Sequence, residues 1–409
     1  MALSEKTLNE IISNLDPEDR EALHRQLGKF LENPDTITNQ PTPTAPPVTK
    51  PASKEEDSNF YCCVKCGSAN FKKNGFSDCG VQRYFCKDCR KSWQENEGVA
   101  MKWSHLSQEQ WIELLTGYVN CHSINKIHKD TGISGCSIWL NMIKTFLAIK
   151  HMYGYDEVFT GVCEADEAYM SVSFKGKRDP YFFIYGLGRM PRHHRSREEK
   201  IAYLQDAGLY DKLLEEEPSF LEELLEDEKK KRGISNDQVC ILTIVDDSGH
   251  LYLEPVSVGR LEKAMAKAKV KPKAGRDGNV LVTDEHKAYK NSLYGTGAKH
   301  EAIKADEYKK RKYNLAKVNS VHGELARFMN NINGKLPATK YLDLYLIFFW
   351  WLYKYKDYST KEKVQMLYNI MTDNITDLEA KARVDQITGK EIFSRELTLD
   401  TKGLFPNKV

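Results

Sequence analysis

Val239-Cys-Ile-Leu-Thr-Ile-Val245 is the stretch that decides the fold class. Its residues are apolar or β-branched without a break, which is typical of a strand buried on both faces of a sheet. It runs into Asp246-Asp247-Ser-Gly249, a turn signal, and residues 250–257 follow as a second strand. The segment therefore predicts a β-hairpin. We interpret Asp246 and Asp247 as turn residues.

Two further strands and several helices flank this hairpin. Residues 158–165 alternate as a strand that is expected to end at Asp166, and residues 279–283 predict a second buried strand that ends at Asp284. Helices are expected in three segments: 261–268, 285–293 and 315–333. Strand, hairpin, helix, strand and two helices in this order indicate an α/β domain with a mixed sheet, with bounds near 156–355.

Asp166 and Asp284 stand out because each is expected to end a separate apolar strand. Two carboxylates at one edge of a sheet suit Mg²⁺, which prefers oxygen ligands. Paired Mg²⁺ ions stabilise the entering and leaving oxygens in an in-line attack on a phosphodiester, as in the RNase H-like arrangement of nucleases and transposases. The alternative is that each aspartate is a turn residue or a helix cap, and Asp284 directly precedes an expected helix.

Upstream, two C-x-x-C pairs predict a structural zinc site. Cys63-Val-Lys-Cys66 and Cys86-Lys-Asp-Cys89 are separated by nineteen residues, a spacing within the range for a four-thiolate zinc ribbon, expected over 60–95. Such a site is closed and leaves no position open for catalysis. Basic residues of the ribbon are candidates for DNA contact, namely Arg83, Lys87, Arg90 and Lys91. The alternative is a zinc clip, that is, a structural zinc site that only stabilises a small fold and does not contact DNA.

Residues 104–150 predict a helix-turn-helix. A short amphipathic helix leads to Gly132, Ser134 is placed to cap the next helix, and Ile138-Trp139-Leu140 continues it. The second helix of such a unit can lie in the major groove of DNA. Plain helix packing is the alternative interpretation.

The rest of the chain of 409 residues divides by composition. Residues 1–32 predict a helical segment, 33–59 a disordered linker rich in Pro and Thr, 177–231 an insertion with an acidic amphipathic helix from 213 to 231, and 356–409 a helical and polar tail. A net charge of +2 means that any nucleic-acid surface must be local. We find neither a signal pattern nor an apolar run long enough for a membrane span, so we expect no membrane partner and a cytoplasmic, nucleoid-associated location.

Several blocks of the chain resemble the ISXO-like group of zinc-ribbon insertion-sequence transposases over roughly residues 5 to 355. Besides the cysteine pairs, the similar blocks are Asp166-Glu-Ala-Tyr169, Thr283-Asp284-Glu-His-Lys-Ala-Tyr289 and Asn319-Ser-Val-His322-Gly-Glu324. The resemblance implies a DNA transposase with an RNase H-like core that uses Mg²⁺ or Mn²⁺. It also implies binding to terminal inverted repeats of double-stranded DNA, cleavage and strand transfer, and a homo-oligomer on DNA.

The resemblance makes Asp166 and Asp284 metal-binding carboxylates and leaves the third catalytic position open. Alignment favours His322, and Glu324 is the alternative. Two residues turn a helix by about 200°, so His322 and Glu324 cannot both point at one metal pair. Two rival functions remain: a catalytically inactive, transposase-derived DNA-binding protein, and a zinc-ribbon nuclease or regulator.

Overall fold

The computed structural model describes residues 63, 66–76, 82–94, 100–101, 104–152, 159–226, 233–304, 312–333, 337–372 and 399. The chain divides into two compact units, residues 1–59 and 60–409, and every described residue belongs to the second. The helical segment expected at 1–32 and the linker expected at 33–59 lie outside the described residues, as does the tail at 373–398 and 400–409.

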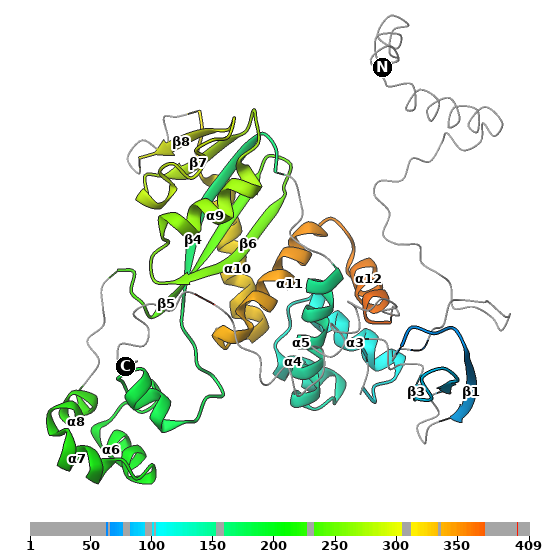
Figure 1. Cartoon of the computed structure of the whole chain (residues 1–409), viewed down its shortest axis with the longest axis horizontal. Helices are drawn as coiled ribbons and strands as arrows, with labels where there is room; N and C mark the ends of the chain where they lie inside the picture. The colour runs from blue at the N-terminus through cyan, green and yellow to red at the C-terminus, as the bar shows by residue number, and fades with distance from the viewer. Residues whose placement is uncertain are drawn as a thin grey trace, which may run out of the picture. The chain divides into compact units, whose positions relative to one another are not determined.

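The second unit contains a five-stranded mixed sheet (Figure 1). Its strands are β4 (Val162–Ser171), β5 (Gln238–Asp246), β6 (Leu251–Val258), β7 (Val280–Asp284) and β8 (Lys299–Ile303). The spatial order is β6-β5-β4-β7-β8. Strands β4, β5 and β6 pair antiparallel, whereas β7 runs parallel to β4 and β8 runs parallel to β7. The predicted hairpin and the mixed α/β sheet are therefore confirmed.

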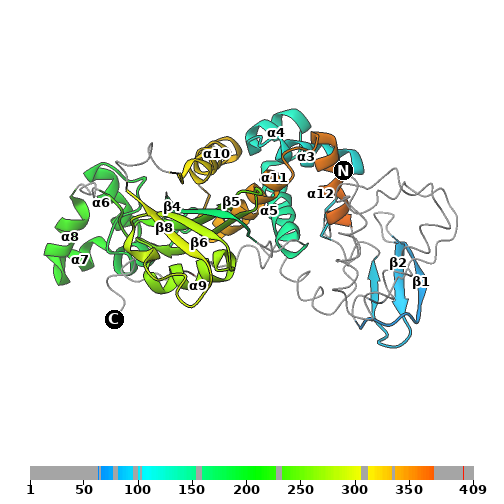
Figure 2. The same cartoon turned by 90° about the horizontal axis from the view of Figure 1, so that it is seen from above.

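Helices cover both faces of this sheet. Helix α9 (Lys263–Ala274) packs Ala266 and Val270 against one face, together with Cys163 and Ala165 of β4. Helix α10 (Ala316–Asn333) contacts β4 and β5 and lies on the opposite side (Figure 2). Strand β5 is buried at eight of its nine residues, which explains its unbroken apolar sequence.

Two sequence predictions for this sheet and its connections were wrong in detail, and one strand was missed. Strand β4 does not end at Asp166 but continues to Ser171, because it pairs with β5 along its whole second half. The helix expected at 285–293 is only the 3₁₀ turn η4 (Lys287–Tyr289). Strand β8 was missed because four of its five residues are exposed at the sheet edge and give no apolar pattern.

The helices that precede the sheet in sequence pack against the helices that follow it. They are α3 (Gln108–Val119), α4 (Ile124–Thr131), α5 (Gly135–Met152), the short η5 (Thr339–Tyr341), α11 (Leu342–Lys354) and α12 (Thr360–Thr372). Phe146 of α5 stacks on Phe348 of α11 with ring centroids 4.4 Å apart. Helix α11, which is rich in aromatic residues, also contacts β6 and is therefore a buried helix on the sheet.

Residues 104–150 form helices α3, α4 and α5, and a tight turn separates α4 from α5. Gly132 ends α4 in the left-handed conformation at φ 72°, and the helix pair bends by 117°. Ser123 caps α4 by accepting from the backbone N–H of Lys126. Among the described residues, no single helix is long and apolar enough to span a membrane, and only this bent pair passes that test when taken together.

Residues 172–237 connect β4 to β5. The connection contains the π-helical turn η3 (Phe182–Gly186) and helices α6 (Arg197–Asp206), α7 (Tyr210–Glu216) and α8 (Pro218–Leu225), which share an apolar core of their own. The prediction of a single acidic helix from 213 to 231 is therefore wrong. Pro218 starts a new helix, because proline fits the first helical turn but not a helix interior.

Candidate functional site

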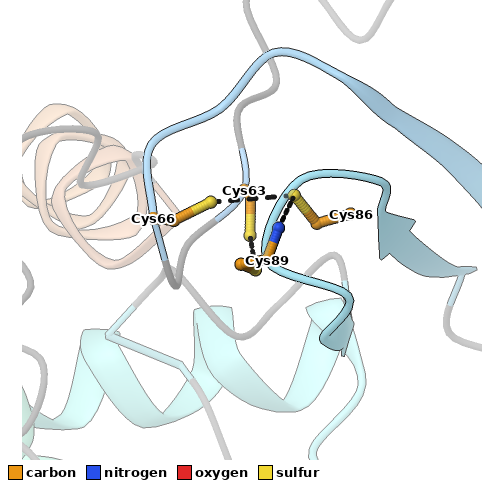
Figure 3. A group of neighbouring side chains, drawn as sticks. All are labelled: Cys63, Cys66, Cys86 and Cys89. Carbon is orange, nitrogen blue, oxygen red and sulfur yellow. Dashed lines mark hydrogen bonds between the residues drawn. The ribbon is translucent and has the colours of Figure 1, made fainter.

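The four cysteines meet at one end of a small three-stranded antiparallel sheet, made of β1 (Phe71–Phe76), β2 (Gln82–Cys86) and β3 (Ser92–Gln94). Their sulfurs point toward a common centre (Figure 3) and all lie within 4.8 Å of one another. The Sγ atoms of Cys63 and Cys89 are 3.6 Å apart, as are those of Cys66 and Cys86. Four Zn–S bonds of about 2.3 Å arranged tetrahedrally put the sulfurs roughly 3.8 Å apart, so the donor set fits Zn²⁺.

A local hydrogen bond favours the metal-binding form of one of these thiols. The backbone N–H of Cys89 donates to Cys86 Sγ, and this bond is the main cause that lowers the pKa of Cys86 to about 7. A lowered pKa favours the thiolate, which is the metal-binding form. The two turns are joined by Asp88, whose carboxylate accepts from Ser68 Oγ and, at 2.8 Å, from Asn70 Nδ2.

Asp166 and Asp284 lie on neighbouring strands at one level of the five-stranded sheet. Strand β4 pairs in parallel with β7 from Val162 opposite Val280 to Glu164 opposite Val282. The same register, continued by two residues, places Asp166 beside Asp284, where β7 ends. Asp166 is therefore in the middle of its strand, and only Asp284 is at a strand end.

His322 of α10 lies over the same face of the sheet. Its Nδ1 is 3.9 Å from Asp166 Oδ2, and its Nε2 is 3.0 Å from Oγ1 of Thr243. Thr243 lies on β5 directly opposite Asp166. A hydroxyl at Nε2 holds the plane of the ring, which leaves Nδ1 facing Asp166.

Burial sets the charge state of this group. It raises the pKa of Asp166 to about 6, and the nearby charge of Asp284 contributes in the same direction. Burial also lowers the pKa of His322 to about 4, so its imidazole is neutral at pH 7. No basic side chain of the described residues contributes to the pKa shift of Asp166. Carboxylates and a neutral imidazole are groups that can bind Mg²⁺ or Mn²⁺, although within the described part of the chain only the four cysteines already have their ligand atoms gathered within 4.8 Å.

Glu324, the alternative third residue, has a different environment. It lines a cavity of about 250 Å³ with Cys121, Arg327, Tyr353 and other residues of α10 and α11. Its charge helps to raise the pKa of Tyr353, an effect second to burial. The structure brings His322, and not Glu324, to Asp166.

Glu167 points to the other face of the sheet. Its Oε1 is 3.7 Å from Nδ1 of His286, and burial raises its pKa to about 7. Oε1 of Glu167, Nδ1 of His286 and the Tyr289 hydroxyl are all buried. Glu167 therefore does not share the face of Asp166 and His322.

The predicted DNA-contacting residues of the ribbon are on its surface. Arg83, Lys87, Arg90 and Lys91 are all exposed. Helix α5 exposes Ser134 and Cys136 at its start, whereas residues 141–149 are buried. The structure thus leaves the first turn of α5, and not its length, available to a partner.

Sequence reasoning missed two residues beside the candidate active site. Thr243 is the one hydroxyl residue in the apolar stretch 239–245, and Glu164 is a carboxylate within a strand, two positions before Asp166. A polar residue inside an otherwise buried strand was the signal available for both.

Comparison with known proteins gives one family match, which covers the region from β5 to α11. Residues 215–353 match the model of the ISXO2-like transposase domain. A solved structure, described as the crystal structure of a pre-cleavage Mos1 transpososome, aligns over 68% of this chain and 77% of that chain at 7% identity. Its TM-score of 0.22 is too low to establish a shared fold. A search of curated proteins gave no match.

Proposed function

We propose that this chain, which carries an ISXO2-like transposase domain, is a DNA transposase of an insertion sequence. The observation that supports catalysis best is the approach of His322 Nδ1 to within 3.9 Å of Asp166 Oδ2, beside Asp284 on the neighbouring strand. The strand order β6-β5-β4-β7-β8, with three antiparallel strands followed by two parallel ones, supports an RNase H-like core.

DNA recognition is assigned to the N-terminal part of the second unit. The ribbon presents Arg83, Lys87, Arg90 and Lys91 on its surface, where they can contact phosphates of the terminal inverted repeats. Helix α5 offers its exposed first turn, which is the part of a recognition helix that reads base edges. The reaction would take place in the cytoplasm on nucleoid DNA, with two or more copies of the chain holding paired ends.

The chain's own residues supply orientation and charge for the chemistry. Asp166 and Asp284 would hold the catalytic cations, with the neutral ring of His322 as third ligand or as the group that orients water. When bound, Mg²⁺ or Mn²⁺ activates the attacking oxygen and stabilises the leaving one. Thr243 holds the His322 ring, and β4, β5 and β7 fix the ligands on a rigid scaffold. The 3′-hydroxyl freed by water attack would then attack a phosphodiester of the target DNA, forming a new bond to its phosphorus and releasing the 3′-hydroxyl of the cut target strand, so no covalent protein–DNA link is needed.

A cleavage assay tests this function. Duplexes with the terminal repeats that flank the gene, incubated with the full chain and Mg²⁺ or Mn²⁺, should be nicked at the repeat end. Asp166→Ala, Asp284→Ala and His322→Ala should each reduce nicking at least ~10³-fold without loss of binding, since removal of a catalytic group has this scale. Glu324→Ala is the matched control on the same helix and should stay active.

Other outcomes identify the rival functions. Binding of the repeats without nicking by the wild-type chain would favour the inactive DNA-binding protein. Absence of inverted repeats around the gene would favour a nuclease or regulator. Activity that depends on Glu324 and not on His322 would reverse the assignment of the third residue.

A further inference from the structure

Glu164 is a buried carboxylate that neither candidate metal centre uses. It lies on β4, two residues before Asp166, and therefore on the same face of the sheet. Its exposed fraction is 4%, and burial raises its pKa above the usual range for a glutamate. A buried carboxylate needs specific hydrogen-bond donors.

The donors come from the start of α10. One oxygen of Glu164, Oε2, accepts from the backbone N–H of Lys317 at 2.9 Å and from that of Val318 at 3.0 Å. These are the second and third residues of the helix, whose N–H groups have no partner inside the helix. A side chain at the helix start normally accepts from them, but the residue before α10 is Leu315, whose side chain has no acceptor.

This contact fixes more than the helix end, because the acceptor belongs to the strand that carries Asp166. Val318 and His322 are four residues apart and thus lie on one face of α10. A hydrogen bond at Val318 therefore sets both the rotation of the helix and its distance from β4 one turn before His322. Strand β4 therefore contacts α10 at two places: Glu164 accepts from the backbone of the helix, and Asp166 faces the His322 ring one turn later.

We propose that Glu164 is a positioning residue that fixes α10 on strand β4 so that His322 faces Asp166. The inference rests on the proposed function for its catalytic consequence. Its structural part, the placement of the His322 ring, does not depend on catalysis. The reach of the glutamate side chain is the decisive property, since one oxygen accepts both N–H groups.

A second tether between the sheet and α10 provides the control. Lys317 Nζ pairs with Asp247 of the β5–β6 turn, where the two side chains are 44% and 50% exposed. An exposed ion pair of this kind contributes little to stability. Lys317→Met removes the pair and leaves both backbone N–H donors in place for Glu164.

Two substitutions at Glu164 make opposite predictions. Glu164→Gln keeps an oxygen at the same reach and loses the charge, whereas Glu164→Asp keeps the charge and withdraws the carboxylate by about 1.5 Å, the length of one C–C bond. Positioning by reach predicts that the Gln variant behaves like wild type and that the Asp variant is impaired. An effect of the negative charge on the helix start or on the metal ligands predicts the reverse.

The experiment follows the full chain by two measurements. Imidazole NMR signals of His322, assigned through His322→Gln, should be unchanged in Glu164→Gln and Lys317→Met and shifted in Glu164→Asp. In the nicking assay, kcat of Glu164→Asp should fall by about 10–100-fold, the scale of losses when a supporting residue of a metal ligand is changed, with KM for DNA unchanged.

Each other result has one meaning. Glu164→Asp with wild-type His322 signals and wild-type kcat would overturn the proposal, as would a Gln variant impaired as strongly as the Asp variant. A wild-type chain that does not nick DNA would contradict the proposed function. The NMR comparison would still decide whether Glu164 positions His322.

Discussion

The four cysteines of the ribbon come from two turns that are close in sequence, whereas Asp166, Asp284 and His322 come from two strands and a helix spread along the α/β domain. The cysteine sulfurs already lie within 4.8 Å of one another. Among the described residues, no such group was found around the two aspartates. The ribbon holds a set of four ligands that could bind a structural metal, whereas the acidic side chains of the second site are not gathered into such a group.

Their electrostatics differ as well. Backbone hydrogen bonds lower the pKa of Cys86 to about 7 and favour its charged, metal-binding form. Burial raises the pKa of Asp166 to about 6 and disfavours its charged form. In the ribbon a local hydrogen bond thus favours the charged form of Cys86, whereas in the α/β domain burial disfavours the charged form of Asp166.

The largest effect should follow from breaking the ribbon. Cys86→Ser removes a fully buried ligand, and structural zinc contributes about 10–16 kcal/mol to the folding of such modules. Bound zinc, measured by atomic absorption, should be lost, and affinity for the repeat duplex should fall at least about tenfold. Cys121→Ser, at a partly buried cysteine outside the group and outside the first turn of α5, is the control. Zinc retained in Cys86→Ser would contradict the four-thiolate site.

A smaller effect is expected at the support of His322. Thr243→Val keeps the shape of a fully buried residue and removes the hydroxyl 3.0 Å from Nε2. Activity in the nicking assay should fall about 10–100-fold, because the ring loses the partner that orients it. Thr145→Val, equally buried on α5, is the matched control. Equal effects of the two substitutions would mean that Thr243 only fills space.

The ribbon and the α/β site also differ in how far their sequence predicts them. Cysteine spacing is a local signal, so the order of residues along the chain is enough to group Cys63, Cys66, Cys86 and Cys89 around one metal. The strand β5 and the helix α10 were equally clear, because burial on the sheet gives the strand an unbroken apolar run and gives the helix an apolar stripe.

What escaped prediction depends on contacts between distant segments. The end of β4 could not be located at Ser171, because its pairing with β5 decides it. Edge strand β8 has no apolar pattern. The choice between His322 and Glu324 depends on how α10 is rotated about its axis, and Glu164 of β4 fixes that rotation by accepting from Val318. The bounds of the N-terminal helical segment, the linker and the insertion stay predictions.

The charge arrangement of the α/β site predicts a change of several degrees in the midpoint of thermal unfolding. Asp166 has a folded pKa of about 6 against an ordinary value of 3.8, so the folded chain binds more protons between these values. Stability without metal should therefore fall as pH rises from about 4 to 6 and then level off. Asp166→Asn removes this loss and should raise the midpoint of thermal unfolding at pH 8 by roughly 2–4 °C.

Two further measurements give this prediction its control. Asp247 has a lowered pKa because it pairs with Lys317, so Asp247→Asn should lower the midpoint at pH 8 or leave it unchanged. Mg²⁺ should stabilise the wild-type chain at pH 8 and have less effect on Asp166→Asn. A lower midpoint for Asp166→Asn without metal would show that the carboxylate is already compensated.

The smallest expected effect concerns DNA binding by the ribbon, because a single exposed cation contributes only one phosphate contact. Lys87→Ala on the ribbon should weaken binding to all duplex sequences alike and reduce the slope of log affinity against log salt by about 0.9. Lys361→Ala, exposed on α12, should leave that slope unchanged. Fluorescence anisotropy over a salt series measures both. If neither the Lys87 variant nor an Arg90→Ala variant changes the slope, the ribbon is a zinc clip that supports the fold without touching DNA, and recognition must come from the first turn of α5.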